Sequence, residues 1–340
     1  MIHGTGSALQ IPSWQDELKR SFKRPSELLD YLHIDPRWLE SPPVHDSEFA
    51  MRVPRGFAKL MEPGNPQDPL LRQVLPVAAE RVAVPGFVAD PVGDLDRSPL
   101  PGLLHKYHGR ALLIITGACA INCRYCFRQH FSYGGQPAGR RLLPSALRYL
   151  AHHPEITEVI LSGGDPLMLF DTQLQGIVER LSTIPHLRRL RIHTRVPVVL
   201  PQRITSGLTR CLTLSRLQPI LVLHLNHARE ASEALGQALL PLRNRGVTLL
   251  NQSVLLKGVN DNAQTLCDLS ESLHTLGVLP YYLHVLDRVV GAHHFETPEY
   301  RALDLHREMA RRLPGYLVPK LVRELPGEQS KTGLGMTDGP

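Results

Sequence analysis

The stretch TGACAINCRYCFRQ (residues 116–129) carries three cysteines within eight residues, Cys119, Cys123 and Cys126. It directly follows ALLIIT (111–116), an apolar run of strand length. Three thiolates on one tight loop can bind three irons of a four-iron cubane cluster, which leaves the fourth iron without a protein ligand. The spacing therefore predicts an iron–sulfur site at the end of a first core strand.

The cysteine usage favours metal binding over disulfide bonds. The two other cysteines, Cys211 and Cys267, stand alone, so the total is odd and clustered. A zinc ion at the three thiols is an alternative, but it needs a fourth ligand, and His130 is the only close candidate. Three buried thiols without a metal are the other alternative.

From residue 111 onward, apolar runs of strand length alternate with amphipathic runs of helix length. This alternation predicts an α/β fold with a parallel sheet covered on both faces. The six strand candidates are ALLIIT (111–116), EVILSGG (158–164), LRIHTR (190–195), PILVLHL (219–225), TLLNQSVLL (248–256) and YYLHVLD (281–287). Periodicity does not separate a doubly wound sheet from a partial barrel. In both, ligands gather at the carboxyl ends of the strands.

The chain divides into three segments by pattern. Residues 1–100 are rich in proline and irregular, with short helix candidates of which the first has Ser13 as its N-cap. We expect an accessory helical layer there, a core over residues 101–316, and a terminal strand and tail over 317–340.

The composition is that of a soluble enzyme, with 42% hydrophobic and 21% charged residues. The formal net charge of +6 comes from scattered arginines and not from a basic tail, which argues against nucleic-acid binding. The sequence has no apolar run of about 18 residues and no signal-peptide pattern, so we expect no membrane contact and a cytoplasmic location.

Polar residues and glycines follow several strand candidates. Glycines let a backbone approach a ligand closely because they carry no Cβ. Alone, however, SGGDP is a common turn, and each polar residue could equally be a core or cap residue. The cofactor-binding candidates of this group are Ser162, Gly163, Gly164, Asp165, His193, Arg195 and Asn226.

The CxxxCxxC spacing, the aromatic Tyr125 and the position after a first strand resemble the radical S-adenosylmethionine superfamily. The resemblance implies a partial (β/α)6 barrel and a [4Fe-4S] cluster whose open iron binds S-adenosyl-L-methionine. The SGGDP segment resembles the one that holds the methionine amino group. Cleavage of this cofactor would yield a 5′-deoxyadenosyl radical.

Residues 100–334 further resemble the lysine 2,3-aminomutase family. The motifs are PGLLHKYHGRALLIITGACAINCRYCFR, LSGGDPL, TRVPVVLPQRI, LLNQSVLLKGVND and YYLHVLD. The resemblance implies an isomerase that shifts an amino group between adjacent carbons, with pyridoxal 5′-phosphate stabilising the substrate radical. It also implies free L-lysine as substrate, (R)-β-lysine as product, and an electron donor of flavodoxin or ferredoxin type.

The resemblance places the pyridoxal phosphate lysine at Lys331, in ELPGEQSKTGLG. A lysine so near a chain end is otherwise most often a solvated tail residue. In the family a glycine-rich segment precedes this lysine, and in this chain the segment is reduced to Gly327. Arg110 and Gln252 are candidates for further contacts with this cofactor, and Lys106 is a weaker one.

Three residues match the substrate contacts of the family. Arg128 matches the arginine that pairs with the substrate carboxylate, for which a planar guanidinium is well suited. Asp287 and Glu324 match two acids that hold the distant ammonium of lysine, with Glu324 in place of the family's aspartate. Two carboxylates at one buried cation would favour a diamine substrate. Alternatively, Asp287 caps a strand and Glu324 is solvated.

Longer members of the family continue past the pyridoxal lysine with a cysteine-containing tail that binds zinc. No cysteine follows Cys267 here, so we expect no structural zinc. The short form resembles the branch that supplies (R)-β-lysine, through a separate β-lysine ligase, for the modification of elongation factor P. The alternatives are a glutamate or other amino-acid 2,3-aminomutase, a non-catalytic iron–sulfur protein, and a radical enzyme that modifies the translation factor directly.

Overall fold

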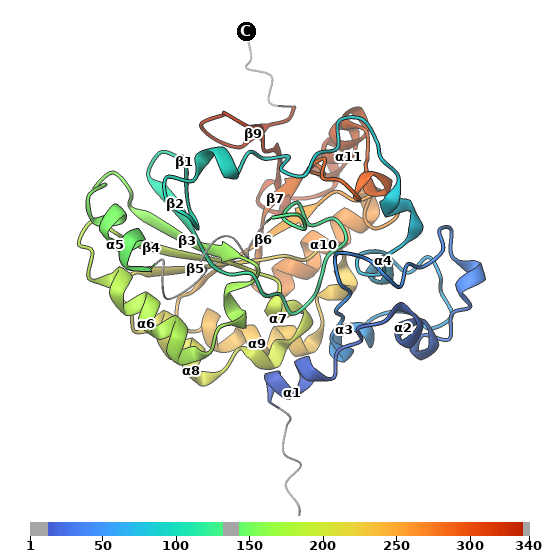
Figure 1. Ribbon diagram of the computed structural model, residues 1–340, viewed down its shortest axis with the longest axis horizontal. Coiled ribbons are helices and arrows are strands. Elements are labelled where there is room, and N and C mark those ends of the chain that lie inside the picture. Colours follow the sequence, from blue (N-terminus) through green and yellow to red (C-terminus); the bar gives the residue numbers. More distant parts are fainter. Residues whose placement is uncertain (1–12, 132–142, 336–340) are drawn as a thin grey trace, which may run out of the picture.

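The computed structural model describes residues 13–131 and 143–335. Within these residues, a single nine-stranded sheet runs in chain order from β1 to β9 (Figure 1). Pairing is parallel from β2 to β8 and antiparallel at the two edges. The strands are β1 (Leu103–Tyr107), β2 (Arg110–Thr116), β3 (Glu158–Gly163), β4 (Arg189–Thr194), β5 (Gln218–Leu223), β6 (Thr248–Val254), β7 (Leu279–His284), β8 (Lys320–Arg323) and β9 (Thr332–Gly333).

The six predicted core strands are confirmed as β2 to β7, and the fold is the predicted partial barrel. The strands follow one another in chain order because helical crossovers of the same handedness place each parallel strand beside the one before it. The two edge strands, β1 and β9, do not pair with each other, so the sheet stays open in the part of the chain that the structure describes.

Helices that follow the strands cover the outer face of the sheet (Figure 1). Three of them, α8, α9 and α10, begin where a side chain accepts a backbone N–H in the first turn, for example Thr205 from Leu208 and Asn262 from Thr265. The helices are α5 (Leu143–Ala151), α6 (Asp171–Ser182), α7 (Val196–Val199), α8 (Ser206–Thr213), α9 (Glu233–Arg243), α10 (Ala263–Thr275) and α11 (Glu299–Arg312). None of the described helices is long and apolar enough to cross a membrane.

The segment that precedes β1 packs on the barrel as short helices. They are α1 (Trp14–Lys19), α2 (Pro25–Tyr31), α3 (Arg55–Ala58) and α4 (Pro69–Arg72). Ser13 is the N-cap of α1, as predicted, because its hydroxyl accepts the N–H of Asp16. Side chains of this segment, such as Phe57 and Leu70, belong to the same buried cluster as Leu113 of β2. Residues 13–100 and the barrel therefore share one hydrophobic core.

Short 3-10 turns complete the connections. They are η1 (Pro36–Trp38), η2 (Ala78–Arg81), η3 (Leu95–Arg97), η4 (Pro166–Met168), η5 (Pro201–Arg203), η6 (Ala228–Glu230), η7 (His293–Phe295) and η8 (Gly315–Leu317). Among them, η4 follows the end of β3 and η6 follows the end of β5.

Candidate active site

A cavity of about 680 Å³ is lined by side chains of the strands and by the loops at their carboxyl ends. Cavities of this size hold cofactor-sized ligands. Every site residue predicted from the sequence lines it except Asn226. These lining residues are Arg110, Cys119, Cys123, Cys126, Arg128, Ser162, Gly163, Gly164, Asp165, His193, Arg195, Gln252, Asp287, Glu324 and Lys331, together with Lys106.

The cysteine loop leaves β2 and is clamped by the segment that precedes the barrel. The Arg52 guanidinium donates to the Cys119 carbonyl at 2.7 Å, and the Arg124 N–H donates to the Gln73 carbonyl at 2.9 Å. Burial raises the pKa of the Cys126 thiol to about 11 and that of Cys119 well above its usual value. Buried thiolates therefore need a cationic metal centre to neutralise them.

The two glycines after β3 are required by contact with this loop. Gly163 has φ of +118°, and a Cβ on it would meet the Thr116 carbonyl oxygen at 2.5 Å. A Cβ on Gly164 would meet the Ala118 carbonyl oxygen at 2.4 Å. The Gly164 N–H donates to the Thr116 carbonyl at 2.7 Å. The glycine segment is thus fixed directly against the start of the cysteine loop.

Asp165 joins the ends of β3 and β4. Its carboxylate accepts the Thr194 hydroxyl at 2.7 Å and the N–H groups of Arg195 and Val196 at 2.7 and 3.0 Å. Burial raises its pKa, and these hydrogen bonds oppose the rise. Because these contacts use both of its oxygens, Asp165 holds the shape of the site.

Three histidines at the carboxyl ends of β4, β5 and β7 line the cavity, His193, His224 and His284. Burial holds the pKa of all three below the usual value, that of His224 at about 3, so each imidazole is neutral at physiological pH. His224 shares a hydrogen bond of 2.9 Å with the Tyr125 hydroxyl. The buried Nε2 of His193 has no hydrogen-bond partner among the described residues, and such an atom is well placed to contact a ligand.

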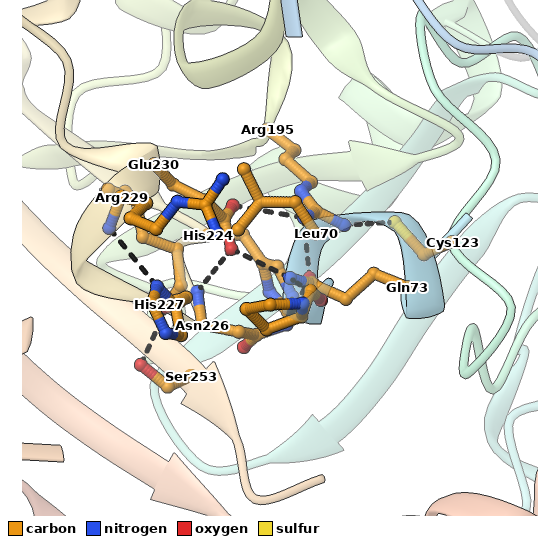
Figure 2. Close-up of polar contacts among 12 residues, drawn as sticks. Leu70, Gln73, Cys123, Arg195, His224, Asn226, His227, Arg229, Glu230 and Ser253 are labelled. Carbon is orange, nitrogen blue, oxygen red and sulfur yellow. Dashed lines mark hydrogen bonds and ion pairs between the residues drawn. The ribbon is translucent and has the colours of Figure 1, made fainter. Parts of the chain in front are cut away.

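Arg195 reaches the second cysteine from the end of β4. Its guanidinium donates to the Cys123 sulfur at 2.8 Å and forms an ion pair of 3.0 Å with the buried Glu230. Asn226 belongs to the same polar cluster as Arg195 and Glu230 (Figure 2). Its side-chain amide donates to the Tyr125 hydroxyl at 2.6 Å. This position explains why Asn226 does not line the cavity.

A chain of alternating charges crosses another part of the cavity wall. Arg128 donates to Asp94 at 2.8 Å, and Lys106 lies 2.5 Å from the other oxygen of Asp94. Lys106 also donates to Glu324 at 3.1 Å, and Lys331 donates to the second Glu324 oxygen at 2.9 Å. Burial would raise the pKa of Glu324, but Lys331 and Lys106 outweigh it and hold the pKa well below its usual range. Glu324 is therefore an ionised partner of two lysines.

Asp287 differs from Glu324 in having no such partner. Within the described residues its carboxylate makes no ion pair and no hydrogen bond, although it faces the same cavity. Its removal from bulk water and the nearby Glu324 carboxylate raise its pKa to about 7, despite the opposing charges of Lys331 and Lys106. A cationic group of a ligand in the cavity could therefore form an ion pair with Asp287.

Two contributors were not predicted from the sequence. Asp94, in the irregular stretch before η3, is buried and joins Arg128 to Lys106. Arg52 holds the cysteine loop from the N-terminal segment. Neither residue stands in a recognisable motif or at the end of a core strand, so only their contacts reveal them.

Known proteins with similar sequences identify the family of the chain. Residues 108–188, which include the cysteine loop, match the family described as "4Fe-4S single cluster domain". The chain is 52% identical over 332 residues to the L-lysine 2,3-aminomutase of Escherichia coli, covering 96% of this chain and 97% of that protein. It belongs to the radical S-adenosylmethionine lysine 2,3-aminomutase family.

Two further members of the family show how the similarity extends. The L-lysine 2,3-aminomutase of Haemophilus influenzae is 47% identical over 320 residues, with 94% of this chain and 95% of that protein covered. That of Clostridium subterminale is 35% identical over 323 residues, with 94% and 77% covered. Membership makes this protein an isomerase that uses a [4Fe-4S] cluster and S-adenosylmethionine. The three thiols, the glycine segment beside them and the unpartnered His193 nitrogen fit these cofactors.

Proposed function

We propose that this protein converts L-lysine to (R)-β-lysine by a 1,2-shift of the amino group. The observation that carries the proposal is that one cavity holds the three cysteine thiols, the Arg128 guanidinium and, separately, the Asp287 carboxylate, which pairs with no described residue. An α-amino acid with a distal ammonium complements this arrangement at both ends. Glutamate, the rival substrate, would set a second carboxylate against Asp287, and two carboxylates repel.

In this proposal Cys119, Cys123 and Cys126 hold the cluster. Once an electron donor of flavodoxin or ferredoxin type has reduced the cluster, the cluster and S-adenosylmethionine would together supply a radical. Ser162, Gly163 and Gly164 hold S-adenosylmethionine, His193 and Arg195 shape the walls around it, and Asn226 supports that wall from behind through the Tyr125 hydroxyl. The contacts of Asp165 with β4 support this role indirectly, since they fix the loop that carries the glycines.

Pyridoxal 5′-phosphate is the second cofactor of the proposal, and it supplies the π-system across which the nitrogen moves. Several observations support its fit. Arg110 lines the cavity and makes no ion pair among the described residues, which leaves its charge for a phosphate. Gln252 lines the same cavity. Lys331 lies over the Tyr282 ring, with 5.6 Å from Nζ to the ring centroid. Lys331 is the proposed attachment point.

Substrate binding then follows from charge. Arg128 binds the α-carboxylate and is oriented by Asp94. Asp287 binds the distal ammonium. Glu324 contributes a second negative charge nearby, but Lys106 and Lys331 share it. The shared charge assigns the larger part of ammonium recognition to Asp287.

The deciding experiment is turnover under strictly anaerobic conditions. The protein is reconstituted with iron and sulfide and incubated with S-adenosylmethionine, pyridoxal phosphate, dithionite and L-lysine, and the products are separated by chiral chromatography. We expect (R)-β-lysine from the unmodified protein and at least a thousandfold less from Lys331→Ala and Cys123→Ala. Lys320→Ala is the matched control, because Lys320 is an exposed lysine of β8 outside the cavity. Cofactor cleavage without β-lysine would reject lysine as the substrate.

We further propose that the product serves elongation factor P through a separate β-lysine ligase. The support is that the chain matches 97% of the length of the Escherichia coli relative but 77% of that of the Clostridium subterminale relative, and so resembles the former more closely. Mass spectrometry of elongation factor P from cells that lack this protein tests the link. We expect the β-lysyl form to disappear and to return when (R)-β-lysine is added to the medium. A β-lysyl form that persists without the protein would refute it.

A further inference from the structure

Behind the cysteine loop lies a buried polar network built from four separate segments (Figure 2). Gln73 comes from the end of α4, Arg195 from the end of β4, Asn226 from the loop after β5, and Glu230 from η6. Gln73, Asn226 and Glu230 have no exposed surface, and Arg195 is 6% exposed. Burial of a carboxylate and a guanidinium at such depth is costly, so a specific role is expected.

Arg195 is the member that touches the cysteine loop. One guanidinium nitrogen donates to the Cys123 sulfur at 2.8 Å and to the Tyr125 hydroxyl at 2.7 Å. The other nitrogen donates to the Gln73 amide oxygen at 2.7 Å and to Glu230 at 3.0 Å. The guanidinium therefore bridges a cysteine sulfur on one side and a carboxylate on the other.

Glu230 is itself fixed by two further contacts. Its second oxygen accepts the Gln73 amide at 3.0 Å and the Asn226 N–H at 3.1 Å. With the contact from Arg195, the carboxylate has three donors and no freedom to turn away. The Arg195 guanidinium therefore lies next to the Cys123 sulfur, and the Glu230 carboxylate lies on the other side of the guanidinium.

This arrangement of a cation near Cys123 and an anion behind it has an electrostatic consequence for an iron–sulfur cluster on Cys123. Reduction adds one negative charge to the cluster, so a nearby cation favours the reduced form and a nearby anion opposes it. Hydrogen bonds to the cysteine sulfur act in the same direction as the cation. Both charges are buried, so water screens them little.

We propose that Glu230, anchored by Gln73, positions the Arg195 guanidinium on Cys123 and sets the reduction potential of the cluster. Glu230 and Gln73 are positioning residues, since neither lines the cavity. Glu230 keeps the potential low by balancing part of the Arg195 charge. A low potential suits a centre that must pass an electron to S-adenosylmethionine. The inference rests on the proposed cluster ligands but not on lysine as the substrate.

The test is a redox titration of the reconstituted protein, followed by the electron paramagnetic resonance signal of the reduced cluster, without S-adenosylmethionine or lysine. Glu230→Gln keeps the shape of the side chain and removes its charge. We expect the ratio of reduced to oxidised cluster at a fixed potential to rise about tenfold, a shift of about 59 mV for one electron. An unchanged midpoint in a protein that carries its full cluster would overturn the proposal.

A matched control separates this effect from the general loss of a buried carboxylate. Glu158 is also buried and paired with two arginines, but it stands at the start of β3, away from the cysteines. We expect Glu158→Gln to leave the midpoint where it is. An equal shift in both variants would show that the position of Glu230 has no special effect.

If Glu230→Gln does not fold or does not take up iron, a second variant provides the test. The double variant Arg195→Gln with Glu230→Gln removes both buried charges and keeps two amides that can hydrogen-bond. Because the lost cation lies nearer to the cluster than the lost anion, we expect the midpoint to fall below that of the unmodified protein. A midpoint that stays equal or rises contradicts the proposal. Absence of any cluster in the unmodified protein would instead refute the proposed function.

Discussion

Asp287 shows how one side chain acquires its properties from its surroundings. The residue ends the sixth predicted strand, and its carboxylate faces the cavity with a pKa raised to about 7. Above pH 7 the free protein carries a charge there that no described residue pairs. A substrate ammonium would supply the missing partner and draw the pKa back down.

The raised pKa predicts a pH dependence of lysine binding. Asp287 is protonated below about pH 7, so we expect affinity for L-lysine to rise between pH 6 and pH 8 and then to level off. Asp287→Asn should weaken binding at least tenfold at pH 8 and flatten this part of the profile. Calorimetry on protein loaded with pyridoxal phosphate would measure both.

L-Norleucine provides the control, because it has the shape of lysine without the distal ammonium. Asp287→Asn should not weaken norleucine binding. A variant that loses affinity for both ligands alike would show damage to the cavity and not the loss of an ammonium contact.

The same carboxyl affects stability with the opposite sign. A group whose pKa is higher in the folded state than in the unfolded chain holds its proton longer when folded. Asp287 therefore makes the iron-free protein less stable as the pH rises from about 4 to 7, and contributes no further change above that. We expect Asp287→Asn to remove this decline, which thermal unfolding measured across that pH range would reveal. A decline as steep in the variant would assign it to other groups.

At the scale of single residues, the sequence predicts well which residues line the cavity. It predicts less well which side chains these residues contact. Chain position after a strand suffices to place His193, Arg195 and Asp287 near a ligand. It does not reveal that Glu324 is shared by two lysines, because that sharing depends on side chains more than two hundred residues apart. Asp94 also escapes prediction, because it stands in no motif and only its contacts with Lys106 and Arg128 place it at the site.

Among the elements, the glycine segment after β3 and the cysteine loop after β2 depend on each other. The parallel pairing of β2 with β3 brings both ends to one edge, and two backbone hydrogen bonds join Gly164 and Asp165 to the loop. A methyl group at Gly164 has no room unless residues 117 and 118 of the loop move.

We expect Gly164→Ala to displace the cysteine loop and reduce cluster content well below that of the unmodified protein. Iron and sulfide per chain after anaerobic reconstitution measure this directly. Gly176→Ala, in the middle of α6, is the control: a Cβ there meets no atom within 4 Å. Alanine in a helix interior is favoured over glycine by up to about 1 kcal/mol, so the control should be neutral or stabilising. Full cluster content in Gly164→Ala would show that the cysteine loop can shift to make room for the methyl group and still bind the cluster.

The core strands were predictable because each is a long apolar run bounded by turn residues. Edge strands β1 and β9 were not, since each is short and half-exposed and depends on a neighbour for its pairing. The N-cap of α1 was predictable from Ser13 alone, because capping is a local interaction.

At the scale of the whole molecule, the first hundred residues behave as part of the site. Residues 13–100 share the main core with the barrel, supply Arg52 and Asp94 to the cavity wall, and supply Gln73 to the buried network behind it. The sequence suggested an accessory layer from the irregular, proline-rich pattern. Their contact with the cysteine loop could not be read from that pattern, because it arises only when the layer is packed on the barrel.

Arg124 is the strongest link between this layer and the cysteine loop. Its side chain is 1% exposed and forms a two-pronged ion pair with Glu80, and it donates to the Phe49 carbonyl at 2.7 Å and the Ser47 hydroxyl at 2.9 Å. Removing one partner of a buried ion pair costs about 3–5 kcal/mol, because the other charge stays buried without compensation. We therefore expect Arg124→Met to lower the melting temperature of the iron-free protein by several degrees.

The same variant should loosen the layer and the loop together, which distinguishes a clamp from a merely stabilising pair. Hydrogen exchange followed by mass spectrometry should show faster exchange in residues 47–53 and 119–126, with little change in β4 and β5. Arg189→Met is the control, since Arg189 is also paired with a glutamate but is 39% exposed, and such pairs contribute about 1 kcal/mol or less. Faster exchange in the loop alone would mean that the N-terminal layer holds its place without it, and that the two are not coupled.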